Sequence, residues 1–279
     1  MTRELTDEMI NDFKVYLADN ERSRATVSKY LHDVMVFYRF VENKKVDKSL
    51  VTGYKERLLE THSVTGANSM IAAVNTFLRF LGWNDCCVKQ YRVQRQVYCS
   101  EEKELTKSEY MRLISTANAT GNERISLIIQ TICGTGIRVS ELEFITVEAL
   151  KKGEACVSCK GKTRTVFIVS ALRKKLLNYS KKHNIKKGIL FVTKNGNPVN
   201  RSNIWREMKN LCKEAGVSPK KVFPHNLRHL FARTFYGIEK DIAKLADILG
   251  HTSINTTRIY IITTGAEHKR KLENMRLII

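Results

Sequence analysis

The chain has 279 residues, of which 43% are hydrophobic and only three are proline, a composition that excludes intrinsic disorder and allows one or two folded domains. Its 48 lysines and arginines outnumber 28 acidic residues and give a net charge of +20. Such a charge predicts a polyanionic partner, most simply nucleic acid held by its phosphates, although an RNA binder of the ribosomal type or a protein that touches anionic membranes has the same signature.

The N-terminal sequence carries acidic residues where a secretory signal needs an apolar run. No apolar run approaches transmembrane length. Seven cysteines without the spacing of a disulfide framework are typical of a reducing compartment. The sequence therefore predicts a cytoplasmic protein.

The first 90 residues are predicted to form a bundle of four helices. Polar residues that can cap a helix precede stretches in which apolar side chains recur at helical spacing. We expect helices over 6–17, from 23 onward, over 47–60 and from 65 to 82, with Thr6, Ser23 and Thr65 as caps and Gly82 as the end of the fourth. Such helices form a self-contained bundle, and we assign its aromatic residues to the core: Tyr30, Phe37, Phe77 and Phe80.

A second domain is predicted to begin after a polar linker. Helical periodicity fails from residue 89 to 103, which is basic at first and then acidic. Thr106 and Glu109 then form a capping box, and Leu105 and Tyr110 have the spacing of its hydrophobic staple. We assign residues 1–90 to a helical domain, 91–104 to a linker, and 105–279, with a tail over 266–279, to a second domain.

The second domain is predicted to be mainly helical with a small β-sheet, so the fold class is α+β. Residues 154–169 alternate like two strands of a hairpin, with Lys160 at its tip. In the turn 134–142, two glycines end one helix and Arg138 begins the next. The other expected elements are helices to Ala117, from Asn122, from Ser170 to 183 and from Asn200 or Ser202 to Gly216, and a short buried strand over 188–192.

Titratable residues gather near the C-terminus, at the ends of short helices. His225 and Arg228 lie one turn apart on the same face of a helix that we expect to end at Gly237. The next helix stops before His251, and a final short helix brings in Tyr260. A lone tyrosine near a helix end is usually a packed residue with its hydroxyl in water, so this pattern alone predicts no function.

Two patterns resemble metal sites, and we expect neither to bind metal. His225 and His229 have the spacing of a zinc pair, but Asn226 stands where a metalloprotease has glutamate. Cys156 and Cys159 form a single CxxC pair, whereas a structural zinc site usually needs a second pair.

Five separated motifs resemble, in order and spacing, those of the tyrosine recombinase (phage-integrase-like) family. They are G-T-G-I-R-V-S-E-L, the hairpin K-G-K-T-R, H-N-L-R-H, L-G-H and a tyrosine nine residues after that histidine. The resemblance covers about residues 105–265, and the N-terminal helices resemble the family's core-binding domain, which contacts DNA. Carried over residue by residue, the catalytic residues of the family fall on Arg138, Lys160, His225, Arg228, His251 and Tyr260. Glu141 resembles the buried acid that steadies the first arginine, and Lys162, on the same turn as Lys160, could serve in its place.

The resemblance implies a site-specific DNA recombinase that cleaves and rejoins strands through a 3′-phosphotyrosyl intermediate and a Holliday junction. Arg138 and Arg228 can each donate a planar fork to phosphate oxygens. Tyr260 would attack the phosphorus with His225 as its base, and Lys160 would protonate the leaving 5′ oxygen. Because one phosphoester is exchanged for another of similar energy, we expect no ATP, no metal and no other cofactor.

The resemblance also implies the partners. They are double-stranded DNA, a second protomer on each site, four protomers at a synapse, and accessory DNA-binding proteins, without a membrane. Two other functions stay open, a type IB topoisomerase-like enzyme and a DNA-binding architectural protein that does not cleave. The tail 266–279 ends in an apolar tip, Leu277–Ile279, without an evident partner of its own, so we expect it to dock on a neighbouring protomer.

Overall fold

The computed structural model describes residues 3–42, 44–93, 101–159, 161–193, 195–260, 269–270 and 273–275. The chain divides into two compact units, Met1–Arg95 and Gln96–Ile279, each with its own hydrophobic core. Among the described residues, no helix is both long and apolar enough to cross a bilayer. Most of the tail 266–279, with its apolar tip, falls outside the described residues, so its docking stays a prediction.

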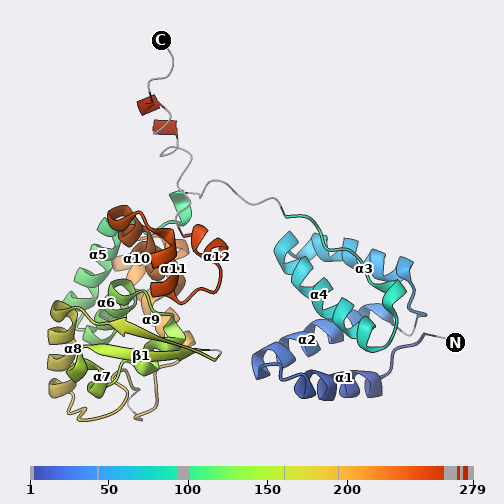
Figure 1. Cartoon of the computed structure of the whole chain (residues 1–279), viewed down its shortest axis with the longest axis horizontal. Helices are drawn as coiled ribbons and strands as arrows, with labels where there is room; N and C mark the ends of the chain where they lie inside the picture. Colours follow the sequence, from blue (N-terminus) through green and yellow to red (C-terminus); the bar gives the residue numbers. More distant parts are fainter. Residues whose placement is uncertain are drawn as a thin grey trace. The chain divides into compact units, whose positions relative to one another are not determined.

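The first unit is a bundle of four helices followed by a short 3₁₀ turn (Figure 1). Its elements are α1 (Asp7–Asp19), α2 (Arg24–Val41), α3 (Lys48–Thr61), α4 (Val64–Phe80) and η1 (Asn84–Cys86). Thr6 and Ser23 cap the first two helices as predicted. The expected cap at Thr65 is wrong, because the hydroxyl of Ser63 already accepts a hydrogen bond from the backbone of Gly66 and starts α4 two residues earlier.

Aromatic side chains fill the core of the first unit. Phe13, Phe37 and Phe77 are fully buried. The rings of Phe13 and Phe77 lie 5.0 Å apart, and those of Phe37 and Tyr54 lie 4.9 Å apart in an edge-to-face arrangement. These aromatics therefore pack the bundle, as the sequence predicted.

The second unit is mainly helical, with one β-hairpin (Figure 1). Its elements are η2 (Glu101–Lys103), α5 (Lys107–Ala119), α6 (Glu123–Thr135), η3 (Val139–Phe144), α7 (Val147–Lys152), β1 (Glu154–Cys159), β2 (Lys162–Phe167), α8 (Ser170–Lys182), α9 (Arg201–Glu214), η4 (Pro219–Lys221), α10 (Pro224–Glu239), α11 (Ile242–Leu249) and α12 (Ile254–Arg258). Helix α6 is central, because it packs against α5, α8, α9 and α10. The predicted fold class, mainly α with a small sheet, is confirmed.

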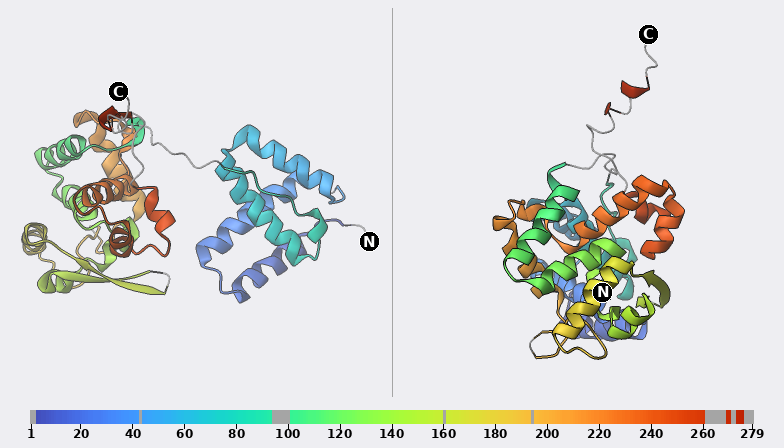
Figure 2. Two further views of the ribbon diagram at one scale, coloured as in Figure 1. Left: turned by 45° about the horizontal axis from the view of Figure 1, so that its top comes forward. Right: turned by 90° about the vertical axis from the view of Figure 1, so that its left-hand side faces the viewer.

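The two strands pair antiparallel, from Glu154 opposite Phe167 to Cys159 opposite Lys162, and Figure 2 shows them side by side along one edge of this unit. The strand expected over 188–192 is wrong. That segment makes isolated bridges, one between Thr146 and Ile189 and one between Val192 and Pro198, without a neighbouring strand to extend either ladder. Leu190 and Phe191 in this segment are buried as predicted, whereas Ile189 and Val192 are partly exposed, and the segment has a loop conformation.

Helix α10 continues past the glycine that was expected to end it. Gly237 lies inside the helix, and α10 ends at Glu239, followed by the capping residue Lys240, which has a left-handed φ of 58° and donates from its backbone to Tyr236. A glycine inside a helix costs only about 1 kcal/mol relative to alanine, so the packing of the helix outweighs it. α10 carries most of the titratable residues described next.

Candidate active site

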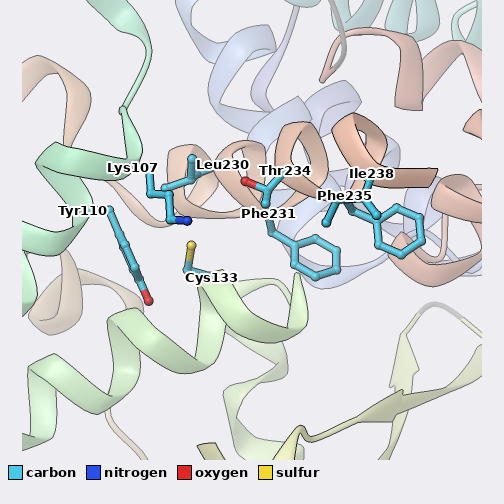
Figure 3. A pocket seen from close by; sticks show the side chains of 8 residues that line it. All are labelled: Lys107, Tyr110, Cys133, Leu230, Phe231, Thr234, Phe235 and Ile238. Carbon is cyan, nitrogen blue, oxygen red and sulfur yellow. The ribbon is translucent and has the colours of Figure 1, made fainter. Parts of the chain in front are cut away.

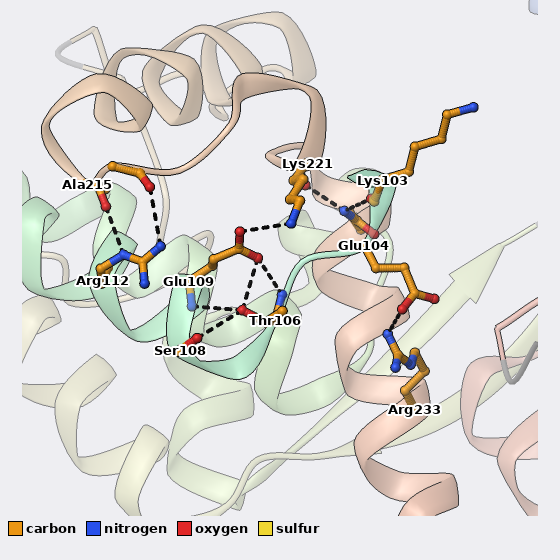
Figure 4. A network of polar contacts seen from close by, with 11 residues as sticks. Lys103, Glu104, Thr106, Ser108, Glu109, Arg112, Ala215, Lys221 and Arg233 are labelled. Atoms are coloured by element: carbon orange, nitrogen blue, oxygen red, sulfur yellow. Dashed lines mark hydrogen bonds and ion pairs between the residues drawn. The ribbon is translucent and has the colours of Figure 1, made fainter. Parts of the chain in front are cut away.

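The N-terminus of α10 is held by a network of polar contacts that begins just before α5 (Figure 4). The side-chain amide of Asn226 donates to the carbonyls of Lys103, at 2.9 Å, and of Lys221, at 2.6 Å. Two helical turns further on, Arg233 pairs with Glu104. These contacts fix α10, which begins next to His225, against the start of the second unit.

The same network contains the capping box predicted at the start of α5. Thr106 accepts from the backbone of Glu109, whose carboxylate accepts in return from the backbone of Thr106 at 2.8 Å. Lys221 adds an ion pair with Glu109 at 3.0 Å. The box therefore also anchors the segment that leads into α10.

Arg228 is the most unusual residue of α10, because its guanidinium is 1% exposed. It donates to the carbonyl of Gly136, to the carbonyl of Leu249 at 2.6 Å and to Nε2 of His251 at 3.0 Å. Within the described part of the chain, no carboxylate pairs with it and its Nε has no partner. Burial, and then the charge of Arg138, lower the pKa of Arg228 to about 10, so the side chain stays cationic at neutral pH although no carboxylate of the described residues contacts it.

Arg138 is placed beside this cation by a buried acid. Glu141, 1% exposed, accepts from the backbone of Arg138 at 2.7 Å and from its Nη1 at 2.9 Å. Burial alone would raise the pKa of Glu141, but hydrogen bonds from Arg164 and from the backbone of Arg138 outweigh it and lower this pKa to about 2. The carboxylate is therefore ionised and holds the guanidinium of Arg138 at the edge of the site, where its side chain is 37% exposed.

The protonation of His251 follows from its two hydrogen bonds. A guanidinium can only donate, so Nε2 of His251 accepts from Arg228 and the ring proton is on Nδ1. Nδ1 lies 2.9 Å from Oγ1 of the buried Thr257, to which it donates. Burial, and then Arg228, lower the pKa of His251 to about 4, so the ring is neutral at pH 7.

Tyr260 lies directly after α12, 3% exposed, against three histidine rings. Its ring centroid is 4.2 Å from that of His229, 5.3 Å from that of His251 and 5.4 Å from that of His225. Burial is the main cause of a lowered pKa in both His225 and His229, and the pKa of His229 falls to about 4. The tyrosine is thus surrounded by neutral imidazoles, one of which, His225, starts the same helix as Arg228.

A glycine makes this arrangement possible. Gly136, which ends α6, has a φ of +67°, and a Cβ on it would lie 2.4 Å from Cδ1 of Phe231. A side chain at this position would therefore push α10 away from α6, and so move Arg228 away from the carbonyl of Gly136 that it contacts.

Five of the six predicted site residues come together: Arg138, His225, Arg228, His251 and Tyr260. Lys160 falls outside the described residues, and Lys162 is described only through its place in β2. The contact between Arg138 and Glu141 is present.

Three residues of the site were given no role in it from the sequence, although His229 was noted for its spacing from His225 and Arg164 ends the K-G-K-T-R motif. His229 and Thr257 contact the rings of Tyr260 and His251. Arg164, on β2, forms a two-pronged ion pair with Glu141. A signal for Arg164 exists in the sequence, because it alternates with the buried Val166 on the inward face of a strand, where an arginine needs an acid.

A separate apolar cavity of about 290 Å³ lies between α5, α6 and α10 (Figure 3). It is lined by Lys107, Tyr110, Cys133, Leu230, Phe231, Thr234, Phe235 and Ile238. None of the five site residues that the structure brings together is in this lining, so the cavity is not the place of phosphate chemistry.

The phage integrase family matches residues 103–266, and the N-terminal SAM-like domain of phage integrases matches residues 10–85. The tyrosine recombinase XerA of Pyrococcus furiosus is 28% identical over 98% of this chain and 96% of its own. The tyrosine recombinase XerH of Campylobacter jejuni is 30% identical over 83% of this chain and 72% of its own.

Solved structures show the same fold. A crystal structure of XerA recombinase has a TM-score of 0.55 at 27% identity, covering 99% of this chain and 100% of its own. XerH bound to its difH substrate in a pre-cleavage complex has a TM-score of 0.70 at 17% identity, covering 95% and 84%. A lambda integrase tetramer bound to a Holliday junction has a TM-score of 0.75 at 15% identity, covering 93% and 77%.

The fold and the matched relatives define the class of site-specific tyrosine recombinases. This chain belongs to the phage integrase family, as its motifs predicted.

Proposed function

We propose that this protein cleaves and rejoins DNA at specific sites, with Tyr260 as the nucleophile and a 3′-phosphotyrosyl intermediate. The observation that carries the proposal is the buried cation of Arg228, which no carboxylate of the described residues contacts and which bonds His251 beside the ring of Tyr260. A buried charge without a partner is costly, and a phosphodiester placed against it supplies the missing anion.

The two arginines have complementary tasks in this proposal. Arg228 is rigid, since two carbonyls and His251 fix its guanidinium, and it stabilises charge on the phosphate oxygens without reorganisation. Arg138 is more exposed and uses one nitrogen on Glu141, which leaves its other donors for a second oxygen. Lysine could not reproduce either planar fork.

The histidines direct the proton transfers. His225 is neutral at pH 7 because burial, and then three arginines, lower its pKa, so it can take the proton of the Tyr260 hydroxyl as the bond to phosphorus forms. The bond from phosphorus to the 5′ oxygen breaks, and we assign the proton for that oxygen to Lys160, with Lys162 as the alternative donor. His251 accepts from Arg228 and donates to Thr257, so it acts on the phosphate by orienting the guanidinium of Arg228.

The reverse reaction on another strand rejoins the DNA. Since the phosphotyrosyl ester keeps the energy of the phosphodiester, no ATP enters the cycle. We assign residues 1–90 to DNA binding, which the match of the SAM-like domain supports, and 105–279 to catalysis.

We further propose double-stranded DNA as the substrate, with two protomers on a site and four at a Holliday junction. The net charge of +20 supports a DNA partner. The tetramer follows the lambda integrase tetramer on a Holliday junction, and the dimer follows a second similar structure, a lambda integrase dimer bound to a COC' core site. The participation of accessory DNA-binding proteins rests on the family resemblance alone.

The experiment that tests the function uses a nicked suicide substrate, which loses a short fragment after cleavage and so traps the adduct. Wild-type protein is expected to form a covalent complex that survives denaturing electrophoresis, and Tyr260→Phe is expected to bind the same DNA without forming it. Binding without an adduct in the wild type would leave a non-cleaving DNA-binding protein. Relaxation of a plasmid without recombination between two sites would leave a topoisomerase.

A further inference from the structure

Arg164 makes contacts in two parts of the second unit at once. Its Nη1 and Nη2 donate to the two carboxylate oxygens of Glu141, at 3.0 and 2.7 Å. Its Nε donates to the carbonyl of Ile248, in the last turn of α11, at 3.2 Å. One planar group of a strand residue therefore joins η3, which follows Arg138, to the end of the helix that precedes His251.

The chain after α11 passes unusually close to this guanidinium. Gly250 has a φ of +65°, and a Cβ on it would lie 2.9 Å from Cδ and 3.1 Å from Nη1 of Arg164. A residue with a side chain at 250 would have to displace the arginine or the turn. The close approach places His251 directly after the point where Arg164 touches the backbone.

The positions of Arg138 and His251 depend on these contacts of Arg164. Glu141 orients Arg138 through two hydrogen bonds, and Glu141 is itself held in a two-pronged pair by Arg164, whose side chain is 14% exposed. On the other side, the turn at Gly250 leads into the ring that bonds Arg228.

We propose that Arg164 is a positioning residue for strand cleavage, because it sets the place of Arg138 relative to His251 while it contacts neither of them. This inference rests on the proposed function. Arg164 acts through Glu141 and through the backbone of α11, so its loss should misplace two phosphate ligands together.

The first test compares Arg164→Ala with Arg112→Ala under single turnover at saturating suicide substrate. Arg112 is a matched control, since its Nε and Nη also donate hydrogen bonds within the second unit. Their acceptors are the backbone carbonyls of Ala215 and Gly216. We expect Arg164→Ala to form the covalent adduct about 100-fold more slowly, the loss typical of a misplacement of about 1 Å, with DNA affinity retained. Arg112→Ala should cleave at nearly the wild-type rate.

Arg164→Lys provides a conservative variant in case the alanine variant does not fold. It keeps the positive charge and can reach Glu141 with one nitrogen, but it lacks the fork that also contacts Ile248. We expect Arg164→Lys to cleave at least about 10-fold more slowly than the wild type, because a phosphate ligand displaced by less than about 1 Å still loses part of its effect. Cleavage at the wild-type rate by folded Arg164→Lys would show that only charge matters and would overturn the inference.

A double-mutant cycle separates positioning from a general loss of stability. Gly250→Ala should slow cleavage, in part through its clash with Arg164. In the Arg164→Ala background that clash is gone, so the additional loss should be several-fold smaller. Additive losses in cleavage rate, or losses seen only in the melting temperature, would assign Arg164 a structural role alone.

The pH profile gives a readout that a structural role does not move. The described charged groups that act on Glu141 are Arg164 and Arg138, and Arg228 lies close enough for Glu141 to affect its pKa. Without Arg164, burial raises the pKa of Glu141, so cleavage by Arg164→Ala should fall more steeply than the wild-type rate as the pH is lowered below neutrality. Parallel profiles would contradict the inference.

Adduct formation by the wild type and the two alanine variants distinguishes a failure of this inference from a failure of the proposed function. If neither the wild type nor Arg112→Ala forms an adduct, the function itself is wrong. If both form it and Arg164→Ala does so at the same rate, the function stands and the inference is wrong.

Discussion

Arg228 and His251 share a hydrogen bond of 3.0 Å in which the imidazole is the acceptor. The bond fixes the neutral tautomer of His251 with its proton on Nδ1, and it orients the guanidinium without neutralising its charge. Both consequences matter for phosphate binding, because the cation stays available to an incoming anion.

The first prediction concerns Thr257, whose hydroxyl accepts a hydrogen bond from Nδ1 of His251. Thr257→Val keeps the shape of the side chain and removes the acceptor. A net hydrogen bond is worth about 1 kcal/mol, so we expect the rate of adduct formation to fall about fivefold. Thr256→Val, at an exposed position of the same helix, is the control and should leave the rate unchanged. Equal rates for the two variants would show that the tautomer of His251 needs no support.

The second prediction concerns the fork of Arg228. Arg228→Lys keeps the charge but cannot reach Gly136, Leu249 and His251 together. Loss of one preorganised donor to a developing oxyanion costs about 100-fold or more, and we expect a loss of that order in single-turnover cleavage. Arg233→Lys, at a half-buried ion pair on the same helix, is the matched control. A rate within a few-fold of wild type for Arg228→Lys would contradict the role of the planar group.

The third prediction concerns pH and the buried His229. Its pKa is lowered to about 4 in the folded state, against about 6.5 for an unfolded histidine. Between these values the unfolded chain binds more protons, so the free energy of unfolding should decrease as the pH falls from about 6.5 toward 4. His229→Phe should flatten this dependence in denaturant titrations of the full chain at pH 7 and pH 5. An unchanged slope would show that His229 is not buried as a neutral group.

The fourth prediction compares two glycines with left-handed φ angles. Gly136 has a φ of +67° and Gly121 a φ of +69°, but only at Gly136 would a Cβ meet another group, the ring of Phe231 at 2.4 Å. Gly121→Ala should cost about 1–2 kcal/mol from backbone strain alone. Gly136→Ala should cost a further 1–3 kcal/mol, roughly, from overpacking. If the two variants lost the same free energy of unfolding, α10 would have moved to make room for the new side chain at no cost.

Much of the helical frame could be predicted because its signals are local. The capping box of Thr106 and Glu109 and the periodic apolar face of α6 each depend on a few neighbouring residues. Local signals were misleading at Gly237, where packing of α10 outweighs the glycine, and at residues 188–192, where buried apolar side chains occur without a partner strand.

For the site, the sequence predicted the residues but not the contacts between them. The motifs indicated which residues to expect near one phosphate, but spacing along the chain does not reveal contacts between distant elements. Arg164 and Ile248, which are 84 positions apart in the sequence, are such a pair, and Arg228 and Gly136 are another. The packing of His229 against Tyr260 likewise depends on how α12 folds back onto α10.

The most direct measurement is identification of the residue that carries DNA after cleavage of a suicide substrate. Protease digestion and mass spectrometry of the trapped complex should find the 3′-phosphate of the cleaved strand on the peptide that contains Tyr260, and no adduct in Tyr260→Phe. A covalent bond to any other residue, or efficient strand exchange by Tyr260→Phe, would contradict the account.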